Sequence, residues 1–448
     1  MPCQSVWHSC GESPHRRHRW GSRRISGASP FAPGFKTHAN ARGEAGGVVA
    51  TGQNGRVCAV RLIPIHNDIV SSSWGMPGGI SRALGWPETT DAQAELWLGA
   101  HPSAPARPIE ANDFEALDEW EKQSGTTLPY LLKVLTAAHP LSLQAHPNPA
   151  QAAAGFAREE AAGIARTAFD RSYKDPYAKP ELIVALNDGF QALCGFRPIA
   201  QTAAVLTQLA EIAPEPEPVR AFRELLTTEG LRNTVAFTLS RTADVQTLVA
   251  ALVAADQVDG TIAPVIGIVQ RAFPHDDGIA LALLLNHLTL REGESLWLPA
   301  GNVHAYLHGS GIELMGPSDN VLRGGLTPKH IDEAELMNTL VFDEVADPRL
   351  QPIELADGVR TYRPASVPSG EGVPFELWEV TAQATLTLPS ASIFVVTDGD
   401  FTLTLPGSEP PLAAGSEHHL ARGSAHFLTD GAVATISGGG RMWVATAR

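Results

Sequence analysis

The fold is decided by residues 285–332, which read LNHLTLREGESLWLPAGNVHAYLHGSGIELMGPSDNVLRGGLTPKHID. Short apolar segments alternate there with turns at Glu292-Gly293 and at Pro299-Ala300-Gly301. Closely spaced short strands divided by such turns are typical of a β-sandwich or jelly roll. We therefore expect this stretch to build a β-domain.

The same pattern returns between residues 346 and 448. Short strand-like segments are separated there by Gly, Pro, Asp and Ser, which favour turns. A second β-domain is expected over this range. Its predicted strand segments are FELWEVTAQATLTLP (375–389), SIFVVTDGDFTLTLP (392–406) and GAVATISGG (431–439).

Between about residues 150 and 263 the apolar residues recur at helical spacing, which predicts an α-rich segment. Its predicted helices are QAAAGFAREEAAGIA (151–165), QTAAVLTQLAEIA (201–213), VRAFRELLTTEG (219–230) and VQTLVAALVAADQ (245–257).

Residues 57–149 are mixed and mostly β, with strands expected in VCAVRLIPI (57–65) and LPYLLKVLTA (128–137). Asn112 is expected to cap a helix over residues 113–125 that Gly125 closes. The predicted fold is mainly β with an α insertion. Residues 57–149 together with 264–345 form the first β-domain, residues 150–263 are the helical insertion, and residues 346–448 form the second β-domain.

Composition excludes several classes of function. A formal charge of −15 argues against general binding to nucleic acid or to an anionic membrane. No apolar run is long enough to cross a bilayer. Four cysteines without CxxC spacing are typical of free thiols in a reducing compartment, so a cytoplasmic protein is expected.

The first 56 residues differ from the rest, because they contain an arginine cluster between Arg16 and Arg24 and no apolar core of a secretory signal. We expect either a disordered basic extension or residues that precede the true start. A transit peptide is a weaker third interpretation.

Four residues suggest a metal site. Gln144 and His146 are two positions apart, so on a strand both side chains point to one face. Glu181 leads into an apolar strand, and His304 follows a turn into another. Imidazole and carboxylate ligands suit zinc. Spacing alone leaves a second interpretation open, in which these are structural histidines of a β-sandwich.

Several segments, taken in order, resemble the motifs of type I phosphomannose isomerases. They are SSWG (72–75), AELWLGAHP (94–102), LSLQAHPN (141–148), YKDPYAKPELIVAL (173–186) and residues 285–332. The resemblance implies two cupin-like jelly-roll domains and a zinc-dependent aldose–ketose isomerase. It implies one Zn²⁺ per chain and the interconversion of mannose 6-phosphate and fructose 6-phosphate through an enediolate. A monomer is expected, in mannose catabolism or in GDP-mannose biosynthesis.

The resemblance also implies roles for single residues. The zinc ligands correspond to Gln144, His146, Glu181 and His304, and the catalytic arginine corresponds to Arg323. Glu313 is the candidate general base, although a zinc-bound hydroxide is an alternative. The substrate-binding residues correspond to Ser142, Lys179 and Lys329, and Tyr306 is expected to face the same cavity two positions after His304.

This chain departs from the family pattern at two places. The early motif has Ser72-Ser73 where the family usually has an aromatic residue before Ala-Trp-Gly. Where the family commonly has Asn-His before Lys-Pro-Glu, the chain has Tyr177-Ala178.

Three alternative functions stay open: a non-catalytic cupin that binds sugar phosphates, a metal-dependent dioxygenase, and a relative that acts on free mannose. Metal analysis and a substrate assay separate them.

Overall fold

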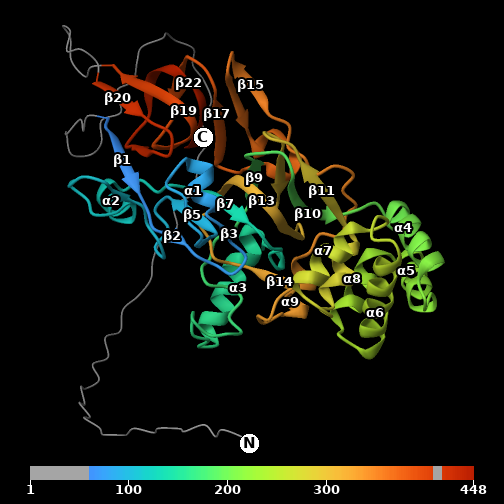
Figure 1. Ribbon diagram of the computed structural model, residues 1–448. Helices are drawn as coiled ribbons and strands as arrows, with labels where there is room; N and C mark the ends of the chain where they lie inside the picture. The colour runs from blue at the N-terminus through green and yellow to red at the C-terminus, as the bar shows by residue number, and fades with distance from the viewer. Residues whose placement is uncertain (1–59, 407–415) are drawn as a thin grey trace, which may run out of the picture. The chain divides into compact units, whose positions relative to one another are not determined.

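The computed structural model describes residues 60–406 and 416–448, and the expectations for residues 1–56 lie outside the described residues. Within these ranges two ten-stranded sheets hold most of the strands, and the helical segment α4–α8 (residues 199–283) is inserted between two strands of one sheet (Figure 1). The fold is mainly β with an α insertion, as the sequence predicts.

The first sheet contains the stretch from which the sequence predicts the fold. Its longest strand is β13 (His304–Met315), which pairs with β10 up to His308, with β7 from Gly309 onward and with β9 from Gly311 onward. Gly309 has φ of 119°, and a Cβ there would lie 2.8 Å from the Cα of Phe190, so the change of partners requires glycine. The other strands of this sheet are β2 (Ile69–Val70), β5 (Glu95–Leu98), β7 (Leu131–Ala137), β8 (Leu143–Ala145), β9 (Glu181–Ala185), β10 (Phe190–Phe196), β11 (Leu285–Leu290), β12 (Ser295–Leu298) and β14 (Leu322–Gly325).

The second sheet is built mainly from the C-terminal residues. Its order is β15-β16-β17-β22-β19-β21-β1-β6, with β18 and β20 paired to β22 and β19. Its C-terminal strands are β15 (Ile353–Ala356), β16 (Val359–Tyr362), β17 (Phe375–Val380), β18 (Ala384–Leu388), β19 (Ser392–Leu405), β20 (Ser416–Leu420), β21 (Ala425–Leu428) and β22 (Ala432–Ala447).

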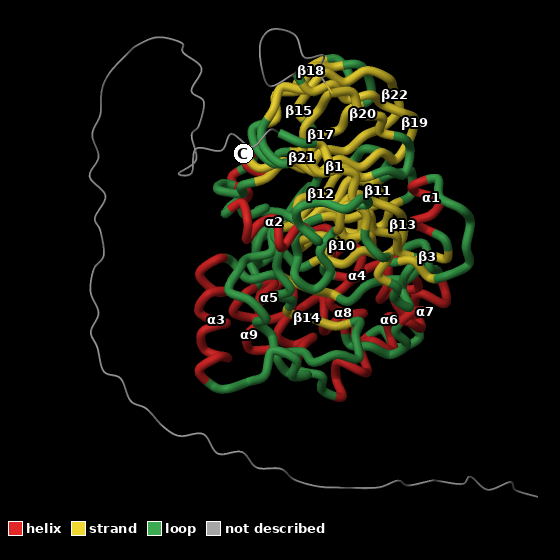
Figure 2. Tube along the Cα trace, turned by 90° about the vertical axis from the view of Figure 1, so that its left-hand side faces the viewer, coloured by secondary structure: helices red, strands yellow, loops and turns green. Residues whose placement is uncertain are grey.

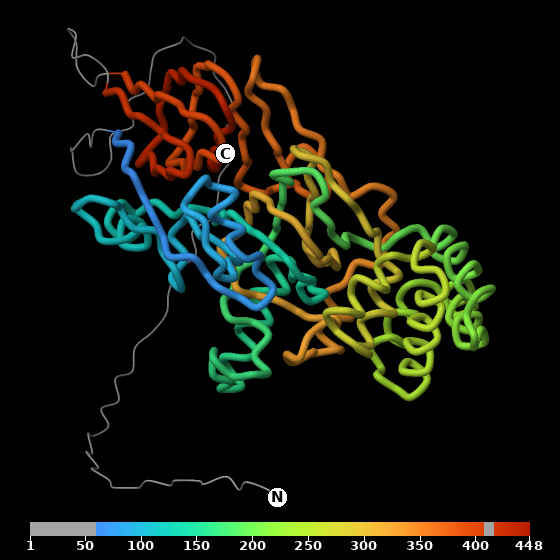
Figure 3. Tube along the Cα trace, in the orientation of Figure 1, coloured from blue at the N-terminus to red at the C-terminus, as the bar shows by residue number. Residues whose placement is uncertain are grey.

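Two N-terminal strands also belong to this second sheet, although the sequence places their residues in the first β-domain. β1 (Leu62–His66) pairs with β21, and β6 (Arg107–Pro108) pairs with β1. Figure 3 shows the blue start of the described chain running beside the red C-terminal strands. Alternation of apolar residues fixes which face of a strand is buried, but it does not select the partner strand.

The helical segment also differs from the expected range of 150–263. The four predicted helices are present as α3 (Pro149–Ala161), α4 (Ile199–Ile212), α5 (Glu217–Leu239) and α6 (Ala243–Val258). However, β9 and β10 separate α3 from α4, and the helices continue through α7 (Pro264–Ala272) and α8 (Gly278–Leu283). Pro264 begins a helix here, because proline is well tolerated in the first turn. Figure 2 shows these helices in red.

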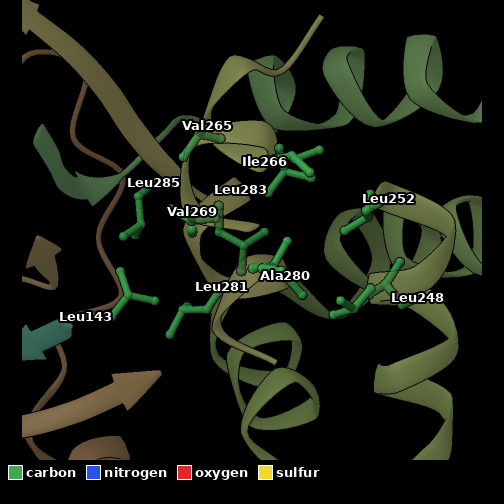
Figure 4. Close-up of a cluster of buried hydrophobic side chains, with 14 of the residues drawn as sticks. Leu143, Leu248, Leu252, Val265, Ile266, Val269, Ala280, Leu281, Leu283 and Leu285 are labelled. Carbon is green, nitrogen blue, oxygen red and sulfur yellow. The ribbon is translucent and has the colours of Figure 1, made fainter. Parts of the chain in front are cut away.

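The helical segment packs directly behind the strands that carry the predicted metal ligands. Leu143 of β8 belongs to the same buried cluster as Leu281, Leu283 and the helix α6 residue Leu248 (Figure 4). Apolar contact of this kind fixes the position of β8, because interiors are close-packed. The helices therefore support the strands that carry the site.

The helix expected after Asn112 is shorter than predicted. Helix α2 (Leu117–Ser124) begins after Ala116, without a side-chain cap, and ends at Gly125 as expected. The Asn112 side chain instead accepts a hydrogen bond of 3.2 Å from Arg61. The contact with Arg61 thus occupies the Asn112 side chain, which the local sequence predicts as the helix cap.

The remaining elements are short. They are α1 (Gly79–Leu84), α9 (Glu333–Thr339), two 3₁₀ turns (Pro364–Ser366 and Pro368–Gly370) and the two-stranded sheet of β3 (Met76–Pro77) and β4 (Ala92–Gln93). In the part of the chain that the structure describes, no helix combines the length and apolarity needed to cross a membrane.

Candidate metal centre

Three predicted ligands come together, buried, at the ends of three strands of the first sheet. His146 follows β8, Glu181 begins β9 and His304 begins β13. The Nε2 atom of His146 lies 3.4 Å from Glu181 Oε1, and the Nε2 atom of His304 lies 3.2 Å from Glu181 Oε2. All three side chains are at most 1% exposed. Among the described residues, no other group of three or more His, Cys, Asp or Glu side chains lies close enough to hold a metal ion.

The two histidines present the atoms that a metal requires. His146 Nδ1 lies 2.7 Å from the carbonyl oxygen of Asn320, and His304 Nδ1 lies 3.1 Å from the carbonyl oxygen of Asn302. A carbonyl only accepts hydrogen bonds, so each Nδ1 carries the proton and each Nε2 keeps a free lone pair. Partners of this kind orient metal-bound histidines in proteins.

Several buried polar atoms of the cluster lack a hydrogen-bond partner. They are Nε2 of His146 and His304 and Oε2 of Glu181. Burial lowers the pKa of His146 to about 4, which keeps its imidazole neutral near pH 7. Burial opposes ionisation of Glu181, but Lys179 and His146 lower the pKa of this carboxyl well below its ordinary value. Two imidazole nitrogens and a carboxylate oxygen that lack a hydrogen-bond partner fit Zn²⁺.

Gln144 and Arg323 lie in one row with His304. In the sheet Arg323 on β14 is opposite Gln144 on β8, and Gln144 is opposite His304 on β13. Directly opposite residues of paired strands project to the same face. Gln144 is half-buried, and the Nε atom of Arg323 is buried without a partner. The strand pairing therefore places both residues on the face that carries His304.

Glu313 lies in a buried network of charged side chains. Its Oε1 accepts a hydrogen bond of 2.8 Å from the Tyr306 hydroxyl, and its Oε2 lies 3.3 Å from Lys133 Nζ. Burial raises the pKa of Glu313, although Lys133 opposes the rise. A buried carboxyl with a raised pKa suits general acid–base chemistry.

The sequence pattern did not single out Lys133 or its second partner, Glu95, which lies 3.0 Å away. Every residue of strand β7 is buried, and Lys133 is its sole charged residue. A lone lysine within an apolar strand is the signal that identifies such a residue, because lysine is almost never fully buried unless it is paired.

The predicted substrate-binding cations lie in two places. Lys179 Nζ is 2.7 Å from Glu181 Oε1, so it contacts a candidate ligand directly. Lys329 is exposed, and its pKa is lowered first by partial desolvation and then by the positive charges of Arg323 and Lys174. Lys174 is a cation that the sequence pattern did not indicate. Ser142 is half-buried immediately before β8.

The segment before Lys179 that departs from the family pattern is anchored on its N-terminal side. Asp175 accepts hydrogen bonds from the Ser318 hydroxyl at 2.8 Å and from the main-chain N–H of Asp319 at 2.8 Å. Tyr177 is 62% exposed, so its ring is not part of the core. The substitution therefore changes the surface of this segment while the contacts of Asp175 and Lys179 persist.

Comparisons with known proteins agree with this site. Residues 62–199 match the model of the family "Phosphomannose isomerase type I, catalytic domain". The chain is 33% identical to a mannose-6-phosphate isomerase of Escherichia coli (strain K12), over 75% of this chain and 89% of the relative. It is 29% identical to that of Ogataea parapolymorpha, over 80% and 92%.

Solved structures give the same result. A point mutant of phosphomannose isomerase from Salmonella typhimurium is similar with a TM-score of 0.76 and 29% identity, covering 86% of this chain and 99% of that one. A zinc-bound mannose 6-phosphate isomerase is similar with a TM-score of 0.74 and 28% identity over the same shares. The buried triad, the two-sheet fold and these similarities together show that the chain belongs to the type I phosphomannose isomerase family.

Proposed function

We propose that this chain interconverts mannose 6-phosphate and fructose 6-phosphate at a zinc centre between β8, β9 and β13. The observation that carries the proposal is the convergence of His146, Glu181 and His304, whose buried metal-facing atoms have no other partner. Family membership supplies the reaction and zinc-bound relatives supply the metal. Gln144 is proposed as the fourth ligand, because it shares a face with His304.

The reaction moves one proton between C1 and C2 of the sugar and another between their oxygens, through an enediolate. Bound Zn²⁺ supplies positive charge that stabilises a negative oxygen. Arg323 presents a planar guanidinium on the same face and is proposed to bind that oxygen or the phosphate. The reacting atoms thus meet charge that the fold has already positioned, which lowers the barrier without further rearrangement.

Glu313 is proposed as the general base. Glu313 is 3% exposed. Its Oε1 accepts the hydrogen bond from the Tyr306 hydroxyl, and its Oε2 lies beside the Lys133 ammonium. These contacts hold the carboxyl in one orientation, and Lys133 balances its charge. Tyr306 therefore acts on the substrate pocket through Glu313 as well as by lining it.

The phosphate is proposed to bind the cations at the end of the site. The positive charges of Arg323 and Lys174 both act on Lys329, and none of the three forms an ion pair with a carboxylate of the described part of the chain. Uncompensated positive charge favours a dianionic phosphate within a protein of net charge −15. Lys179 and Ser142 are proposed to contact the sugar.

The domain organisation remains a proposal with boundaries adjusted to the sheets. The catalytic cupin comprises the first sheet, the helical domain comprises α4–α8, and the C-terminal cupin comprises the second sheet together with β1 and β6. We further propose a cytoplasmic monomer whose reaction serves either mannose catabolism or GDP-mannose synthesis.

The decisive experiment is isomerase activity on mannose 6-phosphate before chelation, after chelation and after zinc is restored. Activity that disappears and returns with zinc supports reaction, substrate and metal together. Free mannose is assayed in parallel, because turnover of free mannose alone would contradict the substrate. Iron instead of zinc in the purified protein would point to the dioxygenase alternative.

A further inference from the structure

Asn320 joins the metal centre to the segment that carries two of the cations. The residue is 0% exposed and lies three positions before Arg323. Its main-chain carbonyl oxygen accepts the hydrogen bond of 2.7 Å from His146 Nδ1. The orientation of His146 therefore depends on where the backbone of Asn320 is held.

The side chain of Asn320 holds residues 174–177. Its Oδ1 accepts from the main-chain N–H of Lys174 at 2.7 Å and, more weakly, from that of Asp175 at 3.3 Å. Its Nδ2 donates to the carbonyl oxygens of Asp175 at 2.7 Å and Tyr177 at 2.9 Å. One planar amide thus fixes both main-chain donors and main-chain acceptors of this segment.

Only a side chain with this composition makes these contacts. An aspartate in the same place would keep the acceptor but would face two carbonyl oxygens without a proton to donate. An apolar residue would leave the main-chain N–H of Lys174 and the carbonyl oxygen of Asp175, which are partly buried, without this partner, and that loss is costly. Ser318 supports the arrangement, because its hydroxyl oxygen accepts from the Asn320 main-chain N–H at 3.2 Å.

We propose that Asn320 is a positioning residue that sets the metal ligand His146 and the segment of Lys174 and Lys179 relative to each other. Lys179 Nζ lies 2.7 Å from Glu181 Oε1, so the position of this segment also affects the second ligand, Glu181. A single buried amide thereby couples the geometry of the zinc site to the placement of the substrate-binding cations. Outer contacts of this kind typically change metal affinity about 10- to 100-fold when they are removed.

The test measures zinc affinity by competition with a chromogenic chelator, together with kcat and KM for mannose 6-phosphate, in the full chain. Asn320→Ala is expected to weaken zinc binding about tenfold or more. With zinc in excess, the variant is expected to retain a raised KM, because Lys174 and the residues that lead to Lys179 are no longer held in place. Wild-type zinc affinity together with a wild-type KM in this variant would overturn the inference.

The matched control is Asn286→Ala. Asn286 is also buried, and its Nδ2 likewise donates to main-chain carbonyls, those of Cys194, Gly195 and Val345. This variant is expected to lower the melting temperature while zinc affinity and KM stay within about twofold of wild type, well below the effect of an outer contact. Equal losses of zinc affinity in both variants would show a general loss of stability and overturn the positioning role.

Asn320→Asp decides the question if Asn320→Ala does not fold. It keeps the volume and the acceptor for Lys174 but loses both donors, and it is expected to weaken zinc binding and to raise KM in the same direction. An Asn320→Asp protein with wild-type zinc affinity and KM would overturn the inference. The inference rests on the proposed zinc site, and the two can fail separately. A wild-type protein that binds no zinc contradicts the site itself, whereas variants with wild-type zinc affinity and KM contradict only the role of Asn320.

Discussion

The hydroxyl of Tyr306 donates a hydrogen bond of 2.8 Å to Oε1 of Glu313, and both side chains are at most 3% exposed. The two residues lie seven positions apart on the same long strand, β13, on either side of the point where the strand changes partners. The irregular backbone at Gly309 therefore brings the tyrosine to the proposed base.

Tyr306→Phe removes this donor and leaves Glu313 with Lys133 as its remaining polar partner. We expect kcat to fall about tenfold or more, the scale of one hydrogen bond to a charged group, while zinc content stays at the wild-type level. Steady-state kinetics and metal analysis provide the measurement. Tyr130→Phe is the matched control, because Tyr130 is equally buried and donates to the main-chain carbonyl of Ala391 instead of to a carboxylate. Similar kinetics for the two variants would argue against a role for Tyr306.

His304→Ala removes one of the three clustered ligands. Zinc content is expected to fall far below one ion per chain, because two protein ligands and a weak amide donor hold zinc poorly. Elemental analysis after dialysis gives the result. The control is His308→Ala, which changes an exposed histidine of the same strand. Stoichiometric zinc in His304→Ala would contradict the ligand assignment.

Arg323→Ala is expected to reduce turnover by about two orders of magnitude or more while zinc content and folding are preserved, because the guanidinium acts on developing charge. Arg223→Ala, in helix α5, removes a half-buried arginine that bonds Thr207, and it controls for the loss of a large cation. If kcat and KM of Arg323→Ala match those of the control, Arg323 has no part in the mechanism.

Lys174→Gln tests the phosphate site. We expect a several-fold rise in KM for mannose 6-phosphate and weaker inhibition by inorganic phosphate, consistent with one partly exposed charge pair. Lys122→Gln is the control, since Lys122 is an exposed lysine on α2 that pairs with Asp118. An unchanged inhibition constant for phosphate in Lys174→Gln would remove Lys174 from the site.

His426 gives a pH dependence that is separate from the metal centre. Burial, with smaller contributions from His418 and His419, lowers its pKa to about 4 in the folded protein. The unfolded chain therefore takes up a proton as the pH falls below about 6.5 while the folded chain does not, so stability is lost between about pH 6.5 and 4.

His426→Gln is expected to lose less stability over this interval, by an amount on the order of 2 kcal/mol at the acid end. Chemical denaturation at a series of pH values measures it. The exposed His66 supplies the control, because His66→Gln is expected to leave the acid loss as in wild type. Parallel pH curves for wild type and His426→Gln would contradict the assignment.

The sequence predicted most of the strands and helices, because apolar periodicity reports local structure directly. The four helices of the α-rich segment and the strands around residues 285–315 follow from it. The pairing of distant strands and the ends of some helices did not follow from this periodicity. The N-terminal strand β1 pairs with β21, more than 350 residues away, and the Asn112 side chain pairs with Arg61 instead of capping a helix.

The candidate site divides in the same way. The residue types and the order of the motifs are enough to identify His146, Glu181 and His304 as candidate ligands, while the role of Arg323 stays a prediction. Spacing along the chain carries no information about which nitrogen of a histidine is free or which groups lie unpaired in the interior. Those facts depend on carbonyls such as that of Asn320, whose position the fold sets.

The sequence by itself therefore determined the fold class, the family and the ligand types, because these depend on local periodicity and on residue identities in order. Only the tertiary structure decided that Lys133 and Tyr306 meet at Glu313, and that Asn320 links His146 to residues 174–177. These contacts join residues that are distant in the chain or brought together within one irregular strand. Side-chain pairing in a close-packed interior is set by the assembled sheets, which no local pattern records.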